Sequence, residues 1–549
     1  MFMPTTSLRT GIKNAFPYKL FPWDDYFARM AETDFLCGRA NIPAAKSFFM
    51  RRAPFGGSYA VLGGITAALC DTDNLNFGSE YFKEGMRAME YKKDFIDWLA
   101  KEIKLKVKVY APQEGSIFFP NEPIVSVEGP LVHIRLVEGI LIEALNFPTL
   151  SMTKWHRILN VVRPGNVMEF ARRRAQNAEK ATLYGMLAGC HATSHSEMKR
   201  FFDFNVVGTM GHEWMQSFGD VRMAFRAWLE NQPGKPVGLV DTKQCMEHDF
   251  PIWLDEVYNH REQIKNANPP LWGWRNDSGD LAQLTTEQYA RFLQHPLSQD
   301  EWFRQKLKIF LTNELDEYTG QSIIDQIQKH LSRNRIPKTK NVKSHFDYVS
   351  SEELLEKIVW AAGTKPGTCD DQPSLGGVAK LVEVEGLACI KLALDAEGRT
   401  GAKTSIPGLN GSSWIEDENG EIKCVLVYPM REYSNIAKVV SGGKTLTTIH
   451  PDNPALKLTF DNCKISSMRQ RLVYDSWNED SFNRLDLSGE TIYSVPRRIR
   501  TEVNQLDWSM TRLDKPNTMK VMVTPELYKL RSKMIQEGVL RKDFLRSEK

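Results

Sequence analysis

The sequence predicts an α/β protein: an irregular α/β barrel packed on an α+β domain that the N-terminal and C-terminal segments form together. Three observations lead to this fold class. Helical and strand-like segments alternate before residue 150, short apolar runs with polar ends then recur at intervals of roughly 30 to 50 residues, and strand-like alternation returns after residue 384. A chain of 549 residues is also too long for one compact core.

The segment before residue 150 contains both kinds of element. Phe82 to Leu105 has the apolar spacing of a helix, and Val132 to Asn146 has it again. Between them, Val107 to Val127 alternates as short strands that glycine and proline interrupt. We therefore expect an α+β domain over residues 1–149.

Six short apolar runs follow, and each leads into polar residues or glycine. Their ends are Glu169, Gly208-Thr209, Asp241-Thr242, Arg275-Asn276-Asp277, Thr312-Asn313 and Gly363-Thr364. Helical patterns separate the runs, as in repeated βα units, and polar residues at the carboxyl ends of parallel strands form the active site of an α/β barrel. The alternative is six unrelated strand ends, because loops are often polar. We expect the barrel over residues 150–384.

The chain returns to strand-like alternation near Val382 to Val384 and again at Lys423 to Tyr428. Asn419-Gly420 is typical of a hairpin turn. These strands are expected to complete the α+β domain over residues 385–490, with residues 491–549 as a C-terminal tail that ends in a basic helix.

Composition excludes several classes of protein. The 71 basic and 68 acidic residues nearly balance, which argues against a nucleic-acid partner. No run approaches the 18 apolar residues of a membrane span, so no membrane partner is expected, and no apolar leader lies near the start. The cytoplasm is therefore the expected location. The eight cysteines include no C-x-x-C pair, which leaves neither a zinc ribbon nor a redox motif.

Six motifs occur in order between residues 40 and 410. They are F-P-N-E-P at 119–123 with V-E-G-P at 127–130, E-F-A-R-R-R-A-Q at 169–176, G-T-M-G-H-E-W at 208–214, R-N-D-S-G-D-L at 275–281, T-N-E-L-D-E at 312–317, and L-G-G-V at 375–378 with K-L-V at 380–382. Each motif alone is weak. In this order and spacing, they make the chain resemble the nicotinate phosphoribosyltransferase family of type II phosphoribosyltransferases.

The resemblance implies an enzyme of NAD biosynthesis. It would join nicotinate to phosphoribosyl pyrophosphate, forming nicotinate mononucleotide and pyrophosphate while ATP is hydrolysed as a co-substrate. Mg²⁺ would arrive on the pyrophosphate rather than in a protein cage, so no metal ligands are expected. The resemblance also implies a homodimer whose active sites are shared between chains.

Departure of pyrophosphate leaves positive charge on the ribose, which a carboxylate stabilises while an arginine holds phosphate. Arg275 and Asp277 suit these tasks, and the resemblance implies that they line the donor and product site. An isolated R-x-D would more often be a structural ion pair. Thr209, Ser278 and Asn313, from the same motifs, are further candidates for substrate binding.

Two glycine-containing turns are candidates for phosphate binding. Backbone N–H groups at Gly363-Thr364 and Gly376-Gly377 could hold the 5-phosphate of the donor, although a plain turn is the alternative. The resemblance places the 5-phosphate loop here. The family carries glycine where this chain has Ala361, which alters the loop.

The flat, anionic nicotinate needs an aromatic partner and a group that binds its carboxylate. The resemblance implies that Phe170 stacks on the ring, that Arg173 lies at the base site, and that Tyr26 reaches the site across a dimer interface. Core packing is the alternative for Phe170.

Thr193 and Ser194 match a segment that separates acid from amide substrates. Related nicotinamide enzymes have aspartate at the position of Ser194, where it accepts a hydrogen bond from the amide and repels a carboxylate. A serine hydroxyl donates to the carboxylate and carries no charge. The sequence therefore favours nicotinate over nicotinamide.

His212 matches the family's phosphohistidine, the residue that ATP phosphorylates during turnover. An imidazole suits this role because one nitrogen attacks while a neighbour holds the other. Gly211 and Glu213 depart from the family's A-H-S pattern, so the loop differs in detail.

Three rival functions remain at this stage. The first is the same transfer onto nicotinamide, and the second is a non-catalytic relative that binds nucleotide. The third is a zinc hydrolase, because His191 and His195 would share one face if they lay on a helix.

Overall fold

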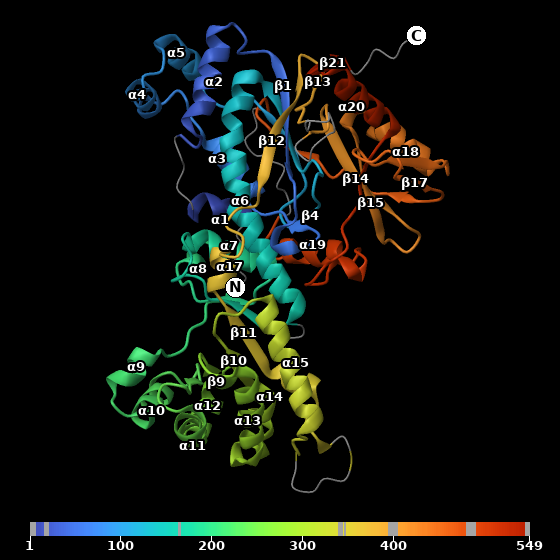
Figure 1. The fold of residues 1–549 in the computed structure, drawn as a ribbon. Coiled ribbons are helices and arrows are strands. Elements are labelled where there is room, and N and C mark those ends of the chain that lie inside the picture. The colour runs from blue at the N-terminus through green and yellow to red at the C-terminus, as the bar shows by residue number, and fades with distance from the viewer. Residues whose placement is uncertain are drawn as a thin grey trace. The chain divides into compact units, whose positions relative to one another are not determined.

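The computed structural model describes residues 7–15, 21–162, 166–338, 344, 347–393, 404–478 and 490–543 (Figure 1). The chain divides into a first unit, residues 1–153 with 371–549, and a second unit, residues 154–370. Helices and strands are mixed in both, so the predicted α/β class is confirmed. The boundaries expected at residues 149, 384 and 490 stay predictions. Among the described residues, no helix is both long and apolar enough to cross a membrane.

A seven-stranded antiparallel sheet lies in the first unit, in the order β19-β3-β5-β1-β12-β13-β21. Its strands are β1 (Pro43–Met50), β3 (Lys108–Ala111), β5 (Val125–Pro130), β12 (Gly377–Val384), β13 (Leu387–Cys389), β19 (Arg471–Asp475) and β21 (Arg541–Asp543). The central strand β1 pairs with β5 on one side and with β12 on the other. Strands from both ends of the chain therefore share one sheet.

The helices of the N-terminal segment differ from expectation in length. They are α1 (Leu8–Ala15), α2 (Asp25–Leu36), α3 (Ile65–Asn74), α4 (Glu80–Ala88), α5 (Lys93–Glu102) and α6 (Leu131–Val161), with the two-stranded pair β2 (Ala60–Val61) and β4 (Ile117–Phe118). The single helix expected near residues 82–105 is two helices, because Glu90 has a φ of 61° between them.

The helix expected to end at Asn146 instead continues through Pro148 to Val161. Pro148 has no N–H to donate to the carbonyl of Ala144 four residues earlier. Gly64 lies against that carbonyl so closely that a Cβ there would be 2.0 Å from the oxygen. The Thr149 hydroxyl also donates to the Gly63 carbonyl at 3.1 Å. Packing against this glycine pair accommodates the proline inside the helix.

The C-terminal segment of the first unit forms a second sheet, which the sequence did not predict as separate. Its order is β17-β16-β20-β15-β14-β18. The strands are β14 (Asn410–Glu416), β15 (Ile422–Pro429), β16 (Leu446–Ile449), β17 (Lys457–Phe460), β18 (Lys464–Ile465) and β20 (Val521–Val523), and the helices are α18 (Tyr433–Ser441), α19 (Ser494–Val503) and α20 (Pro525–Glu537). The hairpin expected at Asn419-Gly420 joins β14 to β15, with Gly420 at a φ of 81°.

The second unit contains a six-stranded, wholly parallel sheet in the order β7-β6-β11-β10-β9-β8. The strands are β6 (Asn166–Glu169), β7 (Ala192–Thr193), β8 (Val237–Leu239), β9 (Trp272–Asn276), β10 (Leu307–Leu311) and β11 (Ile358–Ala362). Their connections are α7 (Ala178–Ala188), α8 (Met198–Phe201), α9 (His212–Ser217), α10 (Val221–Asn231), α11 (Phe250–Asn259), α12 (Arg261–Ala267), α13 (Leu281–Gln294), α14 (Glu301–Lys306), α15 (Glu317–Arg333), α16 (Ser351–Lys357) and α17 (Thr364–Thr368).

Five of the six runs predicted as strands are strands, and one is not. The run at residues 205–207 makes only an isolated bridge, from Val206 to Thr193. The preceding strand β7 is only two residues long, so it offers few backbone groups with which a neighbouring strand can pair. All five residues of β11 are buried, as expected for a parallel strand covered on both faces. Because the strands are parallel, their polar carboxyl ends meet at one edge of the sheet.

Candidate active site

A cavity of about 870 Å³ lies at the carboxyl ends of the strands of the second unit. Its lining brings together most of the residues predicted from sequence: Phe170, Arg173, Ser194, Thr209, His212, Arg275, Asp277, Asn313, Gly363 and Thr364. These residues come from the ends of five strands, β6, β7, β9, β10 and β11, and from the segment before and at the start of α9, and they span about 200 residues of sequence.

Arg275 and Asp277 form the centre of a polar network at the end of β9. The Arg275 guanidinium is 3.0 Å from Asp277 Oδ1 and donates through Nε to Thr312 Oγ1 at 2.9 Å and through Nη1 to Thr209 Oγ1 at 3.3 Å. The Thr312 hydroxyl lies 2.5 Å from Asp277 Oδ1. The ends of β9 and β10, together with Thr209 from the segment before α9, therefore hold this arginine and carboxylate in one orientation.

The same network keeps Asp277 charged. Burial raises the pKa of Asp277, but the hydrogen bond from Thr312 and the charge of Arg275 outweigh it and hold the pKa below the ordinary aspartate value. An anionic Asp277 facing the cavity can stabilise positive charge that develops on a bound molecule.

His212 lies at the start of α9, with a contact on each side of its ring. Nδ1 is 3.1 Å from Thr242 Oγ1, whereas Nε2 is 3.7 Å from Asp241 Oδ1 and 3.8 Å from Asp277 Oδ2. A hydroxyl and two carboxylates thus surround an imidazole that still lines the cavity. This is an environment in which a histidine can act as a nucleophile or hold a proton.

Asp241 is a site residue that the sequence reasoning missed. Its Oδ2 accepts from the Asp277 N–H and from the Ser278 hydroxyl, both at 2.7 Å. Its Oδ1 is buried and makes no hydrogen bond within the described part of the chain. Asp241 could have been found from its place at the polar end of the apolar run Val237 to Val240, because every neighbouring run ends at the cavity. Ser278 acts through Asp241 and does not line the cavity.

A buried glutamate connects the two strand ends that carry Phe170 and Ser194. Glu169 Oε1 accepts from the Ala171 N–H, its Oε2 accepts from the Thr193 hydroxyl, and its carbonyl accepts from the Ser194 N–H at 3.1 Å. Burial raises the pKa of Glu169, although these hydrogen bonds favour its charged form. Thr193 therefore holds Glu169 in place through its hydroxyl and does not line the cavity.

Arg172 and Arg174 also line the cavity beside Arg173, and the sequence reasoning had selected only the middle residue. All three side chains are exposed, and none forms an ion pair within the described ranges. Consecutive arginines that lack carboxylate partners make this wall positive, which suits a phosphorylated or carboxylated ligand.

Gly363 occupies a position where a side chain does not fit. A Cβ there would be 2.4 Å from the Phe170 carbonyl oxygen. The glycine lets the end of β11 pass against the Phe170 loop, where the Phe170 N–H donates to the Ala362 carbonyl at 2.8 Å. Thr364 then begins the short helix α17, and both residues line the cavity.

Three predicted site residues belong to the first unit. Tyr26 lies on α2 with 54% of its surface exposed, and Gly376 and Gly377 precede and begin β12. Gly376 has a φ of 67°, as expected for a turn glycine. The roles assigned to these residues stay predictions.

His191 and His195 do not share a helix face, because β7 lies between them. His195 is buried, with Nδ1 3.1 Å from Thr182 Oγ1. Over the ranges that the structure describes, no group of three or more histidine, cysteine, aspartate or glutamate side chains is arranged to hold a metal ion. His191 and His195 therefore lack the geometry that the zinc hydrolase alternative requires, and that alternative is wrong.

Comparisons with known proteins point to one family. Residues 23–146 match the model of the nicotinate phosphoribosyltransferase (NAPRTase) N-terminal domain. A Bacillus subtilis nicotinate phosphoribosyltransferase is 31% identical over 366 residues, which cover 66% of this chain and 66% of that protein. The chain belongs to the nicotinate phosphoribosyltransferase family.

Other members of the family match over more of the chain. The nicotinate phosphoribosyltransferase of Dictyostelium discoideum is 26% identical over 557 residues, covering 92% of this chain and 86% of that protein. The crystal structure of human nicotinic acid phosphoribosyltransferase has the same fold, with a TM-score of 0.71 at 21% identity over 93% of this chain and 99% of the human one. The family fold thus extends into the C-terminal segment, where the motifs are hard to see.

Proposed function

We propose that this chain transfers the phosphoribosyl group of phosphoribosyl pyrophosphate to nicotinate, giving nicotinate mononucleotide and pyrophosphate for NAD biosynthesis. The observation that carries the proposal is the meeting of Arg275, Asp277 and His212 in one cavity with Phe170 and Ser194. Membership in the family supports the same reaction.

The proposed reaction needs no proton transfer at the carbon that reacts. The pyridine nitrogen of nicotinate donates its electron pair to C1 of the ribose, while the bond from C1 to the pyrophosphate oxygen breaks and its electrons leave with pyrophosphate. Positive charge grows on the ribose during this exchange. Asp277, which its neighbours keep ionised, stabilises that charge, and Arg275 and Thr209 bind phosphate oxygens.

The base and the 5-phosphate are assigned to different residues of the cavity lining. Phe170 provides the ring face for nicotinate, and Arg173 with the Ser194 hydroxyl binds its carboxylate. The N–H groups of Gly363 and Thr364, with the Asn313 side chain, bind the 5-phosphate. The extra positive charge of Arg172 and Arg174 favours these anionic ligands over neutral ones.

ATP and Mg²⁺ complete the proposed reaction. Mg²⁺ would enter bound to the phosphates of phosphoribosyl pyrophosphate and ATP rather than in a protein cage, as its preference for phosphate oxygens and bound water suits. A ring nitrogen of His212 bonds to the γ-phosphorus of ATP while ADP leaves with the electrons of the broken P–O bond, and water later hydrolyses the phosphohistidine to phosphate. Phosphoribosyl transfer proceeds more slowly without ATP.

Substrate choice gives a direct prediction. Wild-type protein is expected to prefer nicotinate to nicotinamide, and Ser194→Asp is expected to weaken nicotinate use by about tenfold, because the new carboxylate repels that of the substrate. Ser196→Asp adds the same charge at an exposed position outside the cavity and serves as the matched control. Competition between labelled nicotinate and nicotinamide measures both effects. Equal or better turnover of nicotinamide by wild-type protein would contradict the predicted preference for nicotinate.

Assembly gives a second prediction. We propose a homodimer in which Tyr26 of one chain completes the site that contains Asp277 of the other. Tyr26→Ala and Asp277→Ala are each expected to be inactive, whereas an equal mixture regains about a quarter of wild-type activity, since half of the dimers contain one intact site. Tyr81→Ala, at another exposed tyrosine of the first unit, should stay active. A monomer in solution, or a mixture no more active than its parts, contradicts shared sites.

A further inference from the structure

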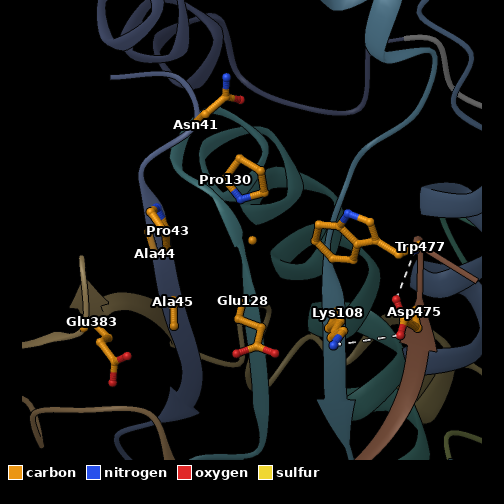
Figure 2. A pocket seen from close by; sticks show the side chains of 12 residues that line it. Asn41, Pro43, Ala44, Ala45, Lys108, Glu128, Pro130, Glu383, Asp475 and Trp477 are labelled. Atoms are coloured by element: carbon orange, nitrogen blue, oxygen red, sulfur yellow. Dashed lines mark hydrogen bonds and ion pairs between the residues drawn. The ribbon is translucent and has the colours of Figure 1, made fainter. Parts of the chain in front are cut away.

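A cavity of about 420 Å³ on the seven-stranded sheet of the first unit has a charged lining (Figure 2). Its acidic side chains are spread over the sheet, because Asp475, Glu128 and Glu383 belong to β19, β5 and β12. Lys108, on β3, lies between Asp475 and Glu128. The lining therefore does not converge on one ligand. A more definite arrangement lies in the second unit, beside the end of β9.

The side chains of β9 alternate between the active-site cavity and the helix α13. Arg275 lines the cavity. Its neighbours Trp274 and Asn276 point to the opposite side of the sheet, because successive side chains of a strand alternate. The Trp274 ring lies against Phe292 of α13, with ring centroids 6.2 Å apart, and both Trp274 and Asn276 are fully buried. The residues on either side of Arg275 are therefore held in the core.

Gln288 of α13 uses the whole hydrogen-bonding capacity of its amide in this core. Its Oε1 accepts from Trp274 Nε1 at 2.7 Å and from Asn276 Nδ2 at 2.8 Å. Its Nε2 donates to Asn276 Oδ1 at 2.9 Å and to Cys245 Sγ at 3.1 Å. An amide oxygen has two acceptor sites and an amide nitrogen has two protons. Gln288 is fully buried, and all four of these positions are filled.

The partners of this amide also fix which way it points. An indole nitrogen can only donate, so the atom of Gln288 next to Trp274 must be the oxygen. A reversed amide would set donor against donor there and would leave buried groups unsatisfied, which is costly. Burial and the charge of Asp241 raise the pKa of Cys245 to about 12, so the thiol keeps the proton that it donates to Asn276 Oδ1 at 3.7 Å. The network therefore has one arrangement.

The network joins two segments that contribute to the active site. Asn276 stands between Arg275 and Asp277 in the chain. Cys245 follows four residues after Asp241, whose carboxylate accepts from the Asp277 N–H at 2.7 Å. One buried amide thus holds the end of β9, with its arginine and carboxylate, to the segment that begins at Asp241.

We propose that Gln288 is a positioning residue for phosphoribosyl transfer, which sets the placement of Asp277 relative to Asp241 from outside the cavity. This inference rests on the proposed function. Gln288 does not line the cavity and acts through Asn276 and Cys245. A displacement of about 1 Å at a catalytic group can cost about a hundredfold in rate. Binding of nicotinate does not depend on Gln288, because the residues assigned to the base lie at the ends of β6 and β7.

Gln288→Met in the full-length protein tests the proposal, because methionine fills a similar space and makes none of the four hydrogen bonds. We expect kcat to fall about thirtyfold, while KM for nicotinate stays within about twofold of wild type. Trp272→Phe is the matched control, because Trp272 is equally buried on the same face of β9 but donates to the Phe303 carbonyl at 2.6 Å, outside the network.

The control should lower thermal stability and leave kcat unchanged. A kcat of Gln288→Met within about fivefold of wild type overturns the proposal, and so does an equal loss of kcat in Trp272→Phe.

A second pair of variants decides the matter if Gln288→Met does not fold. Cys245→Ala removes the bond between the amide and the segment that begins at Asp241, at a partly exposed position. Cys245→Ser keeps a donor and an acceptor there. We expect kcat of Cys245→Ala to be about threefold below that of Cys245→Ser, which is the loss of one modest hydrogen bond. Equal values in the two variants contradict the proposal.

Hydrogen exchange followed by mass spectrometry tests the network without any turnover. The backbone N–H groups of residues 241–249 should exchange faster in Gln288→Met and in Cys245→Ala than in Trp272→Phe, because only the first two variants release this segment from the amide. Exchange at the wild-type rate in both variants overturns this inference alone. Wild-type protein that forms no nicotinate mononucleotide overturns the proposed function instead, so the two failures are distinct.

Discussion

Replacing Asp277 by asparagine is expected to lower kcat for phosphoribosyl transfer by about a thousandfold, equivalent to about 4 kcal/mol. Asparagine keeps the size of the side chain and can still accept the hydrogen bond from Thr312, but it removes the negative charge that faces the cavity. The loss is therefore expected in kcat more than in KM, because the ribose is cationic only in the transition state.

Initial rates at saturating substrates measure this effect. Asp325→Asn, at an exposed position on α15 in the same unit, is the matched control and should keep wild-type activity. Equal thermal stability of Asp277→Asn and wild-type protein would show that the fold is intact. An Asp277→Asn protein within about tenfold of wild-type kcat contradicts the role proposed for this carboxylate.

Replacing His212 by alanine is expected to abolish ATP hydrolysis and the stimulation of transfer by ATP, while slow transfer without ATP continues. In wild-type protein, phosphate on His212 would add roughly one and a half to two negative charges to the cavity that Arg275 also lines, and with Mg²⁺ and Arg275 this charge would order the donor site. ATP should therefore lower the apparent KM values by about tenfold, a typical coupling between two ligands.

The alternative to a phosphohistidine is that His212 only donates a hydrogen bond to phosphate. In that case His212→Asn should retain stimulation by ATP, and incubation with γ-labelled ATP should leave no acid-labile phosphate on the protein. Those two results would contradict the phosphohistidine role of His212 but not the proposed phosphoribosyl transfer. His191→Ala, at an exposed histidine outside the cavity, is the control and should behave as wild type.

The sequence predicted the strands that position the site where apolar runs were long enough to be buried on both faces. The run Ile358 to Trp360 is an example, since β11 is wholly buried. Residues 205–207 have the same pattern but only one pairing partner, a short strand that could not be recognised before folding. Local pattern shows that a segment can form a strand, whereas the neighbouring strand decides whether it does.

Side chains that line the cavity were predicted better than those that hold the lining in place. Arg275 and Asp277 stood out because their chemistry suits the substrate. Asp241 did not stand out, because its role is to accept hydrogen bonds from Asp277 and Ser278, which are distant in sequence. The continuation of α6 past Pro148 was missed for a similar reason, because the compensating contact comes from Gly64. Contacts between segments far apart in the chain are not visible in local sequence.

A paired assay of purified protein with nicotinate and with nicotinamide, each with phosphoribosyl pyrophosphate and Mg²⁺ and with or without ATP, tests the central claim most directly. The account predicts that nicotinate mononucleotide and pyrophosphate form in equal amounts from nicotinate, faster with ATP, and that nicotinamide gives little product. Binding of phosphoribosyl pyrophosphate without any mononucleotide from nicotinate, either with or without ATP, would contradict the proposed function.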